Sequence, residues 1–295
     1  MSIKLNNLKT KLAGTDILLL VLNIILNMIA LFIVLLIPLS YVPNGEYLIL
    51  TLPIFIPIGL TLLGFTTSFQ EIMGIMTIPN QRNMRSEERE FLLPIVQNVI
   101  TKINNVYELN LDINDYIFKV SIEQTPNAFA LGNRNIYISE GLLHNDFATE
   151  KELEAILAHE FAHIIKKDTV FLSAVVGCNF VMRSLGYLST LMAGAIRTTN
   201  KKNASILPIL ALIFNIIFVK ILSNGLFGLI LMFKSRKEEY GCDAFSASLG
   251  YTNELKSFFK KLERIEGRTN IDFINVLYST HPKTSERILA LENLE

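Results

Sequence analysis

A long apolar segment near the start of the chain limits the folds open to it. Residues 17–41 read ILLLVLNIILNMIALFIVLLIPLSY, about 25 residues that would form a helix of roughly 37 Å, enough to cross a bilayer with some tilt. A cleaved signal peptide is the alternative, since Lys4, Lys9 and Lys11 precede the segment. The run is too long for that, and no small-residue cleavage site follows it. We therefore expect a transmembrane helix.

Three further apolar runs follow along the chain. Residues 47–67 come after a short polar turn and are interrupted by Pro53, Pro57 and Gly59, which packing against a neighbouring helix tolerates. The third and fourth runs, residues 170–196 and 206–233, are interrupted by charged residues. Arg183 and Lys220 fall near their middles, and a cation at the bilayer centre costs at least about 2.5 to 3.5 kcal/mol. These two runs either line a hydrated cavity, lie partly outside the lipid, or are core helices of a soluble domain. We expect two membrane hairpins, and so four transmembrane helices.

Charge and cysteine content narrow the classes of partner and site. Lys plus Arg number 27 and so do Asp plus Glu, which gives no broad positive field for nucleic acid. We expect no nucleic-acid partner. The two cysteines, Cys178 and Cys242, lie far apart and form neither a disulfide framework nor a metal-ligand cluster. Any metal must then be held by histidine and carboxylate.

The segment after the first hairpin has the pattern of a soluble domain. Residues 86–109 alternate apolar and polar side chains at helical spacing. The stretches 116–122, 127–131 and 135–139 are rich in β-formers and are separated by turn residues, so they predict a small antiparallel sheet. Thr149, followed three residues later by Glu, opens a further helix with a capping box.

That further helix carries the motif His159-Glu160-x-x-His163. Residues four apart on a helix project from one face, so both imidazoles can reach one zinc ion while Glu160 contacts a water bound to it. A structural role for this Glu in an Ala/Leu/Ile/Phe-rich helix is costly, because a buried carboxylate needs compensation. The motif predicts zinc-activated hydrolysis with Glu160 as general base.

A catalytic zinc needs a third protein ligand, and the downstream segment SRKEEYGCD offers one. Glu239 and Asp243 lie four residues apart, so that Glu239 would bind the metal and Asp243 would hydrogen-bond a zinc-bound histidine. Glu238 is the competing ligand and would face away if Glu239 faces the metal. An ordinary charged helix is the alternative for this segment.

With these motifs in place, nearly the whole chain resembles the HtpX family of membrane zinc metalloproteases, relatives of the CAAX prenyl proteases. The resemblance rests on a membrane hairpin, a soluble part ending in HExxH, two further membrane helices and an SRxxExxAD-like segment. That segment departs from the family pattern at Cys242, where alanine is common. The implied fold is mainly α: four transmembrane helices plus a zincin-like metalloprotease domain with a small antiparallel β-sheet.

The resemblance also implies roles for two other stretches. PNAFALG looks like the family's edge strand beside the metal, which makes Asn127, Ala128, Phe129 and Ala130 substrate-binding residues by strand addition. HPKTSER resembles a C-terminal element whose histidine and arginine, here His281 and Arg287, return to the active site as catalytic residues. His144 matches no motif and is expected to be structural.

The implied organisation has four parts: residues 1–67 as the N-terminal transmembrane hairpin, 68–168 as a soluble catalytic part, 169–233 as a second hairpin, and 234–295 as the C-terminal part of the catalytic domain. Basic residues flank three of the spans and favour a cytoplasmic location for the soluble parts: Lys4, Lys9, Lys11, Lys166, Lys167, Lys234, Arg236 and Lys237. Arg197, Lys201 and Lys202 argue the other way for the second hairpin.

The expected function is that of a zinc endopeptidase of the plasma membrane, with one Zn²⁺ per chain held by His159, His163 and Glu239. By the resemblance, its partners are the lipid bilayer and unfolded or damaged membrane proteins cleaved on the cytoplasmic side. One rival is a CAAX-type protease of prenylated peptides. Another is a silent chaperone or scaffold, against which Glu160 speaks, since a structural zinc has no use for a general base. A transporter would need internal repeats that the sequence lacks.

Overall fold

The computed structural model describes residues 14–40, 42–78, 80–144, 147–199, 213, 227–266 and 282–294, without the side chains of 37–40, 77, 188–199, 227–236 and 266. The chain forms two compact units. The membrane unit comprises Ala13–Thr66 and Phe171–Leu231, and the sheet unit contains Thr67–Val170 and Met232–Glu295.

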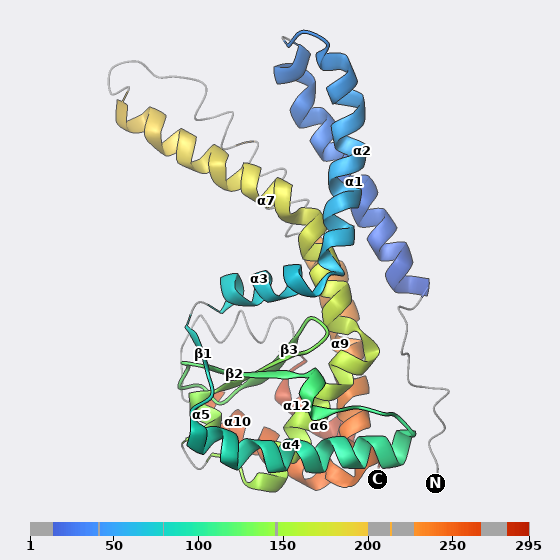
Figure 1. The fold of residues 1–295 in the computed structure, drawn as a ribbon, viewed down its shortest axis with the longest axis vertical. Helices are drawn as coiled ribbons and strands as arrows, with labels where there is room; N and C mark the ends of the chain where they lie inside the picture. The colour runs from blue at the N-terminus through green and yellow to red at the C-terminus, as the bar shows by residue number, and fades with distance from the viewer. Residues whose placement is uncertain are drawn as a thin grey trace. The chain divides into compact units, whose positions relative to one another are not determined.

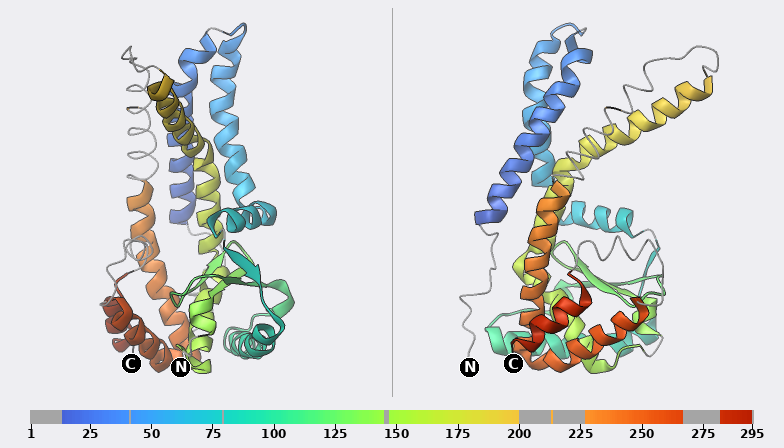
Figure 2. Two further views of the ribbon diagram at one scale, coloured as in Figure 1. Left: turned by 90° about the vertical axis from the view of Figure 1, so that its left-hand side faces the viewer. Right: turned by 180° about the vertical axis from the view of Figure 1, so that it is seen from behind.

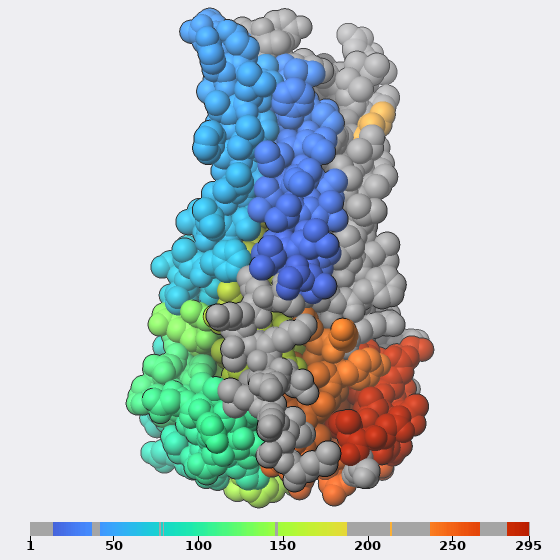
Figure 3. All heavy atoms as spheres, turned by 90° about the vertical axis from the view of Figure 1, so that its right-hand side faces the viewer, coloured from blue at the N-terminus to red at the C-terminus, as the bar shows by residue number. Residues whose placement is uncertain are grey.

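The membrane unit is built from helices α1 (Gly14–Ser40) and α2 (Gly45–Gly64) and most of α7 (Asp168–Thr199). α1 and α2 lie side by side (Figure 3). Among the described residues, three segments are long and apolar enough to cross a bilayer: Gly14–Leu36, Gly45–Gly64 and Asp168–Tyr187. They correspond to the first three predicted spans. Most of the fourth run, 206–233, lies outside the described residues.

Polar contacts and a close backbone approach hold this unit together. Asn27 in α1 donates from Nδ2 to Asn179 Oδ1 in α7 at 2.8 Å, which joins two helices in a region where few polar partners exist. Gly64 lets α2 approach α7, because a side chain there would collide with the backbone of Ala174. Arg183 is exposed near the middle of α7. Lys220 lies outside the described residues.

A four-stranded sheet organises the sheet unit, in the order β1-β2-β4-β3. Its strands are β1 (Gln81–Asn83), β2 (Ile117–Ser121), β3 (Ala128–Leu131) and β4 (Asn135–Ser139). β1 pairs antiparallel with β2, and β3 with β4, but β2 and β4 are parallel. The three predicted strand positions are confirmed, and β1 was not predicted.

The expectation of an antiparallel sheet was wrong, because the sheet is mixed. The chain leaves β2, crosses to the outer edge to form β3, and returns as β4 between them, with Ile117 opposite Asn135. A periodicity of two identifies strands in the sequence but not which strands pair in the sheet. The antiparallel prediction assumed that strands consecutive in the chain are neighbours in the sheet. The crossing leaves β3 at the edge of the sheet, with one side that no described strand pairs with.

Helices cover both faces of the sheet in the sheet unit. The element list is α3 (Thr67–Thr77), α4 (Ser86–Tyr107), a 3₁₀ turn (Ile113–Asp115), α5 (Glu140–Leu143), α6 (Glu150–Lys166), α9 (Phe227–Ser246), a π-turn (Ala247–Tyr251), α10 (Thr252–Glu266) and α12 (Thr284–Glu292). α3 lies over one face, while α4, α6 and α10 form a layer beneath the other (Figure 1). α12 packs against α10 (Figure 2).

The main core lies between the sheet and the α4–α6 layer. Its fully buried side chains alternate along β4 and recur every three or four residues along the two helices, as the sequence pattern predicted for α4. They include Leu92, Val96, Ile103, Ile136, Ile138, Leu153, Leu157 and Phe161. This core fixes α6 beneath the free edge of β3, which positions the site described next.

Candidate metal centre

Helix α6 presents the histidine motif from a buried position. Its N-terminus has the predicted capping box: the Thr149 hydroxyl accepts from the Glu152 N–H, and the Glu152 carboxylate accepts from the Thr149 N–H at 2.8 Å. Twelve of its residues are buried, among them His159 and Glu160, which are 5% and 6% exposed. A helix buried on so many sides gives its polar groups few rotamers, so their geometry is well defined.

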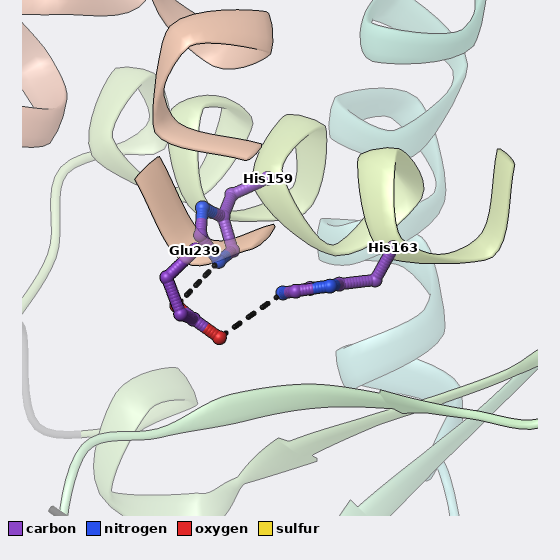
Figure 4. A group of neighbouring side chains, drawn as sticks. All are labelled: His159, His163 and Glu239. Carbon is purple, nitrogen blue, oxygen red and sulfur yellow. Dashed lines mark ion pairs between the residues drawn. The ribbon is translucent and has the colours of Figure 1, made fainter. Parts of the chain in front are cut away.

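His159, His163 and Glu239 converge on one point (Figure 4). His159 Nε2 lies 3.3 Å from Glu239 Oε2, and His163 Nε2 lies 3.3 Å from Glu239 Oε1. One ligand atom from each of the three lies within 4.8 Å of the others, a group that can hold a metal ion. Glu239, 2% exposed and contributed by α9, takes this place, and Glu238 does not.

The donor set fits a catalytic rather than a structural zinc. Two imidazoles and one carboxylate are a known ligand set of zinc hydrolases, which keep the remaining position for water or substrate. Structural zinc sites are usually closed by four protein ligands rich in cysteine. The group of three here has no cysteine among its members, whereas Cys242 belongs to a second possible metal-binding group, with His163 and Asp168, which the sequence did not predict.

A carboxylate and a guanidinium hold His159 from behind. Asp243 Oδ1 lies 2.9 Å from His159 Nδ1. Arg287, from α12, donates to both oxygens of Asp243, from Nε at 2.8 Å and Nη2 at 2.6 Å, and its Nη1 lies 3.4 Å from Glu239 Oε2. Burial opposes ionisation, but Arg287 and His159 together lower the pKa of Asp243. The arrangement fixes the ring of His159 with Nε2 toward the metal position.

Glu160 is connected to the edge strand. Its Oε2 accepts from the Ala130 N–H in β3 at 2.7 Å. Burial raises the pKa of Glu160, despite the opposing effect of the neighbouring histidines. A carboxylate with a raised pKa is a stronger base, and this one lies beside the metal group and the strand at once.

The structure reveals contacts to His163 that the motif did not predict. Asp168 Oδ2, in the first turn of α7, lies 3.4 Å from His163 Nδ1, and Cys242 Sγ lies at the same distance from that atom. The signal for Asp168 was a carboxylate five residues past the second histidine. It was missed because α6 ends at Lys166, and a pattern confined to one helix does not extend across that end.

The structure places most of the other predicted site residues near this group. Ala128, Phe129 and Ala130 form the edge strand, and Asn127 precedes it, with its carbonyl accepting from the Ser139 N–H at 2.9 Å. Arg287 lies against Asp243 and Glu239, as given above. His281 lies outside the described residues.

Comparisons with known proteins point to one peptidase family. The sequence profile described as "Peptidase family M48" matches residues 94–295, more than half of the chain. A protein named "Protease HtpX homolog" from Neisseria meningitidis is 31% identical over 258 residues, which cover 79% of this chain and 85% of the relative. "Protease HtpX" from Haemophilus influenzae is 34% identical over 194 residues, covering 59% of this chain and 66% of the relative. The chain thus spans just under two thirds of the Haemophilus protein.

One solved structure is also similar. The crystal structure of S. mikatae Ste24p superposes with a TM-score of 0.49 and 19% sequence identity, covering 89% of this chain and 61% of that one. A likeness at this level adds nothing to the assignment of the site.

Proposed function

This chain belongs to peptidase family M48 as an HtpX-like member, and we propose that it is a membrane-embedded, zinc-dependent endopeptidase. Membership of this metalloprotease family implies a metal. The finer assignments, zinc as the metal and hydrolysis within unfolded chains as the reaction, are our proposal. His159, His163 and Glu239 would hold one zinc ion.

One observation carries the proposal: Glu160 is buried beside the three candidate ligands and is bonded to the backbone of an edge strand. A site that only stores metal gains nothing from a further carboxylate, beside the three ligands, with a raised pKa. A hydrolase needs a base close to both the metal and the substrate backbone, and Glu160 meets that requirement.

The chain's own groups divide the chemical work. Zinc, when bound, lowers the pKa of a water molecule to about 7 and polarises the scissile carbonyl. Glu160 takes the proton of that water and delivers it to the leaving amine. Asp243 keeps His159 in the tautomer that presents Nε2, and Arg287 holds Asp243 ionised. Arg287 is therefore a positioning residue in this proposal.

The free side of β3 would hold the substrate. Because Asn127 O faces β4, strand alternation directs the backbone groups of Ala128 and the carbonyl of Ala130 outward, toward an incoming extended chain, while the outward N–H of Ala130 donates to Glu160. Backbone pairing reads no side chains and suits an enzyme that accepts many unfolded sequences. Replacing Ala128 by proline removes one outward donor, so KM for unfolded substrates should rise while metal content stays. An unchanged KM would exclude β3 as the binding strand.

The proposed substrates are misfolded or damaged membrane proteins, cleaved on the cytoplasmic side of the plasma membrane. Support comes from the apolar spans, from the basic residues that flank them, and from the relatives' name, HtpX. These are the reasons for preferring quality control to a general digestive role.

The test uses the full chain solubilised in detergent, with an unfolded soluble protein and an unfolded membrane protein as substrates. Cleavage should stop on removal of metal by a chelator and return when zinc is added back. Failure to cleave either substrate at any metal content would contradict the proposal. A strict requirement for a prenylated peptide would favour the CAAX-type activity instead.

A further inference from the structure

Helix α3 has two unlike faces, and the described part of the chain covers only one of them. Ile72, Ile75 and Met76 are 55%, 59% and 62% exposed and lie on one side of the helix, at i, i+3 and i+4. Glu71 is the only charged residue of α3; it borders this face and pairs with Arg134, with side chains 37% and 40% exposed. The face itself is made of apolar side chains, with the ion pair at its edge.

The opposite face of α3 is built for tight attachment to the sheet. Gln70 is fully buried, and Gly74 leaves room for the hydroxyl of Tyr137 in β4, because any side chain at position 74 would collide with it. Tyr137 is itself 1% exposed and stacks on Phe129 of β3, with ring centroids 5.1 Å apart. Since α3 is held against the sheet by one face, its exposed apolar face is available to a partner other than this sheet.

The covered face also holds the turn that joins β3 to β4. Gln70 Oε1 accepts from the Asn133 N–H at 3.0 Å, and Glu71 pairs with Arg134. Gly132 adopts a φ of +67° in that turn, where Gln70 packs against it. α3 is thus a rigid extension of the β3–β4 hairpin, and moving one moves the other.

The short link between the candidate span and α3 restricts where α3 can lie. The candidate span Gly45–Gly64 ends two residues before α3 begins at Thr67. Two linking residues reach at most about 10 Å, so the start of α3 lies at the end of a membrane-spanning helix. A helix that exposes one apolar face in that position can lie in the interface between lipid headgroups and acyl chains.

We propose that α3 is a membrane-surface helix that inserts Ile72, Ile75 and Met76 into the lipid interface and so holds the free edge of β3 at the bilayer surface. The occupant of this apolar face is lipid. A segment pulled from the membrane would then meet β3 as it emerges. The consequence for substrate rests on the proposed proteolytic function, whereas the contact between α3 and lipid does not.

The absence of tryptophan from the chain allows a direct test. Ile75→Trp places a single reporter on the apolar face of α3. Val106→Trp is the matched control, since Val106 is 49% exposed on α4 in a segment that also carries Lys102 and Glu108. Each full-length variant is reconstituted into phosphatidylcholine–phosphatidylglycerol vesicles, with and without spin-labelled lipid. We expect blue-shifted emission quenched by the labelled lipid for Ile75→Trp, and aqueous emission quenched by iodide for Val106→Trp.

Two results would overturn the proposal. Equal iodide quenching of both variants would show that the α3 face is in water. Blue-shifted emission of Ile75→Trp without quenching by labelled lipid would show that protein, such as a second copy of the chain, covers it.

The consequence for substrate is measured separately, with the pair Ile72→Asn and Ile75→Asn in vesicles. KM for a bilayer-embedded substrate should rise several-fold, while KM for a soluble unfolded substrate and the metal content stay at parent values. Unchanged KM for both would remove the link between α3 and substrate capture. A parent protein that cleaves nothing would instead contradict the proposed function, and the fluorescence result would still stand.

Discussion

The sheet unit contains the same trio of side chains twice, once in the metal centre and once away from it. In the metal-site trio, Asp243 lies between Arg287 and His159. In the β1–α4 trio, Glu88 lies between Arg82 and His144, with Arg82 Nη2 at 2.6 Å and His144 Nε2 at 2.6 Å from Oε1. Both arginines bind their carboxylate through two nitrogens.

The two trios differ in what surrounds the part of each histidine ring that points away from the carboxylate. The side chain of His144 is 42% exposed, and that of His159 is 6% exposed and faces Glu239. The β1–α4 trio joins three elements, since Arg82 also binds Glu140 in α5. The metal-site trio joins α12 and α9 to α6. An arginine–carboxylate–histidine trio is thus a structural clamp, and it serves a metal only where the histidine's other nitrogen meets further ligands.

The largest expected effect comes from Asp243→Ala. It leaves Arg287 buried without its bidentate partner, which costs about 3–5 kcal/mol of stability, and it frees the ring of His159. Loss of an orienting carboxylate lowers metal affinity about 10- to 100-fold. Metal affinity is measured by competition with a chelator, on protein first shown to be folded. Parent-like affinity in a folded variant would mean that Asp243 does not position His159.

Glu88→Gln should affect stability alone. The Arg82 hydrogen bond, joined by those of Arg85 and His144, lowers the pKa of Glu88 from 4.5 to about 2, a shift equivalent to about 3 kcal/mol. The neutral variant lacks most of that contribution at pH 7 and should unfold at a lower temperature. Its metal affinity should equal that of the parent. A tenfold loss of metal affinity would show that the β1–α4 trio also supports the metal centre.

The lowered pKa of Glu88 also makes the stability of the folded protein depend on pH. A lowered pKa stabilises the folded state above the unfolded value, so this contribution is complete above about pH 5 and is lost as pH falls toward 2. Thermal unfolding of the parent across this range should show a loss of stability that is smaller in Glu88→Gln. Identical profiles would show that Glu88 is not held ionised by its partners.

A smaller effect is expected from Asp168→Asn. The 3.4 Å separation from His163 is long for a hydrogen bond, and His163 is more exposed than His159, at 14% against 6%. Metal affinity should therefore fall less than about tenfold, below the effect at Asp243. Cys242→Ala is the matched comparison, because it removes the other contact to the same nitrogen, also at 3.4 Å, and should lower metal affinity no more than Asp168→Asn does. An Asp168 effect larger than that of Asp243 would reverse the order.

The sequence predicted those parts of the site that lie within one helix. His159, Glu160 and His163 follow from a spacing of four, and the capping box that starts α6 follows from Thr149 and Glu152. The choice between Glu238 and Glu239 needed the family resemblance or the structure, since adjacent residues on a helix differ only in direction. His144 was expected to be structural, and its pairing with Glu88 agrees.

Other features depend on contacts across elements, which local patterns do not contain. The parallel pairing of β2 with β4 follows from where the chain crosses, and the bond between Ala130 and Glu160 joins a strand to a helix thirty residues on. Asp168 was invisible because it stands beyond the end of α6. The three apolar spans were predictable, because a run of about 20 apolar residues has few other folds open to it.

The most direct test of the proposed function is a paired measurement on Glu160→Gln: metal content by elemental analysis and turnover of an unfolded substrate. Gln preserves the size of the side chain and can still accept from the Ala130 N–H, but it cannot take a proton. We predict one zinc per chain, as in the parent, with turnover reduced about 10²- to 10⁴-fold. Zinc retained together with turnover near the parent rate would contradict the assignment of Glu160 as the base.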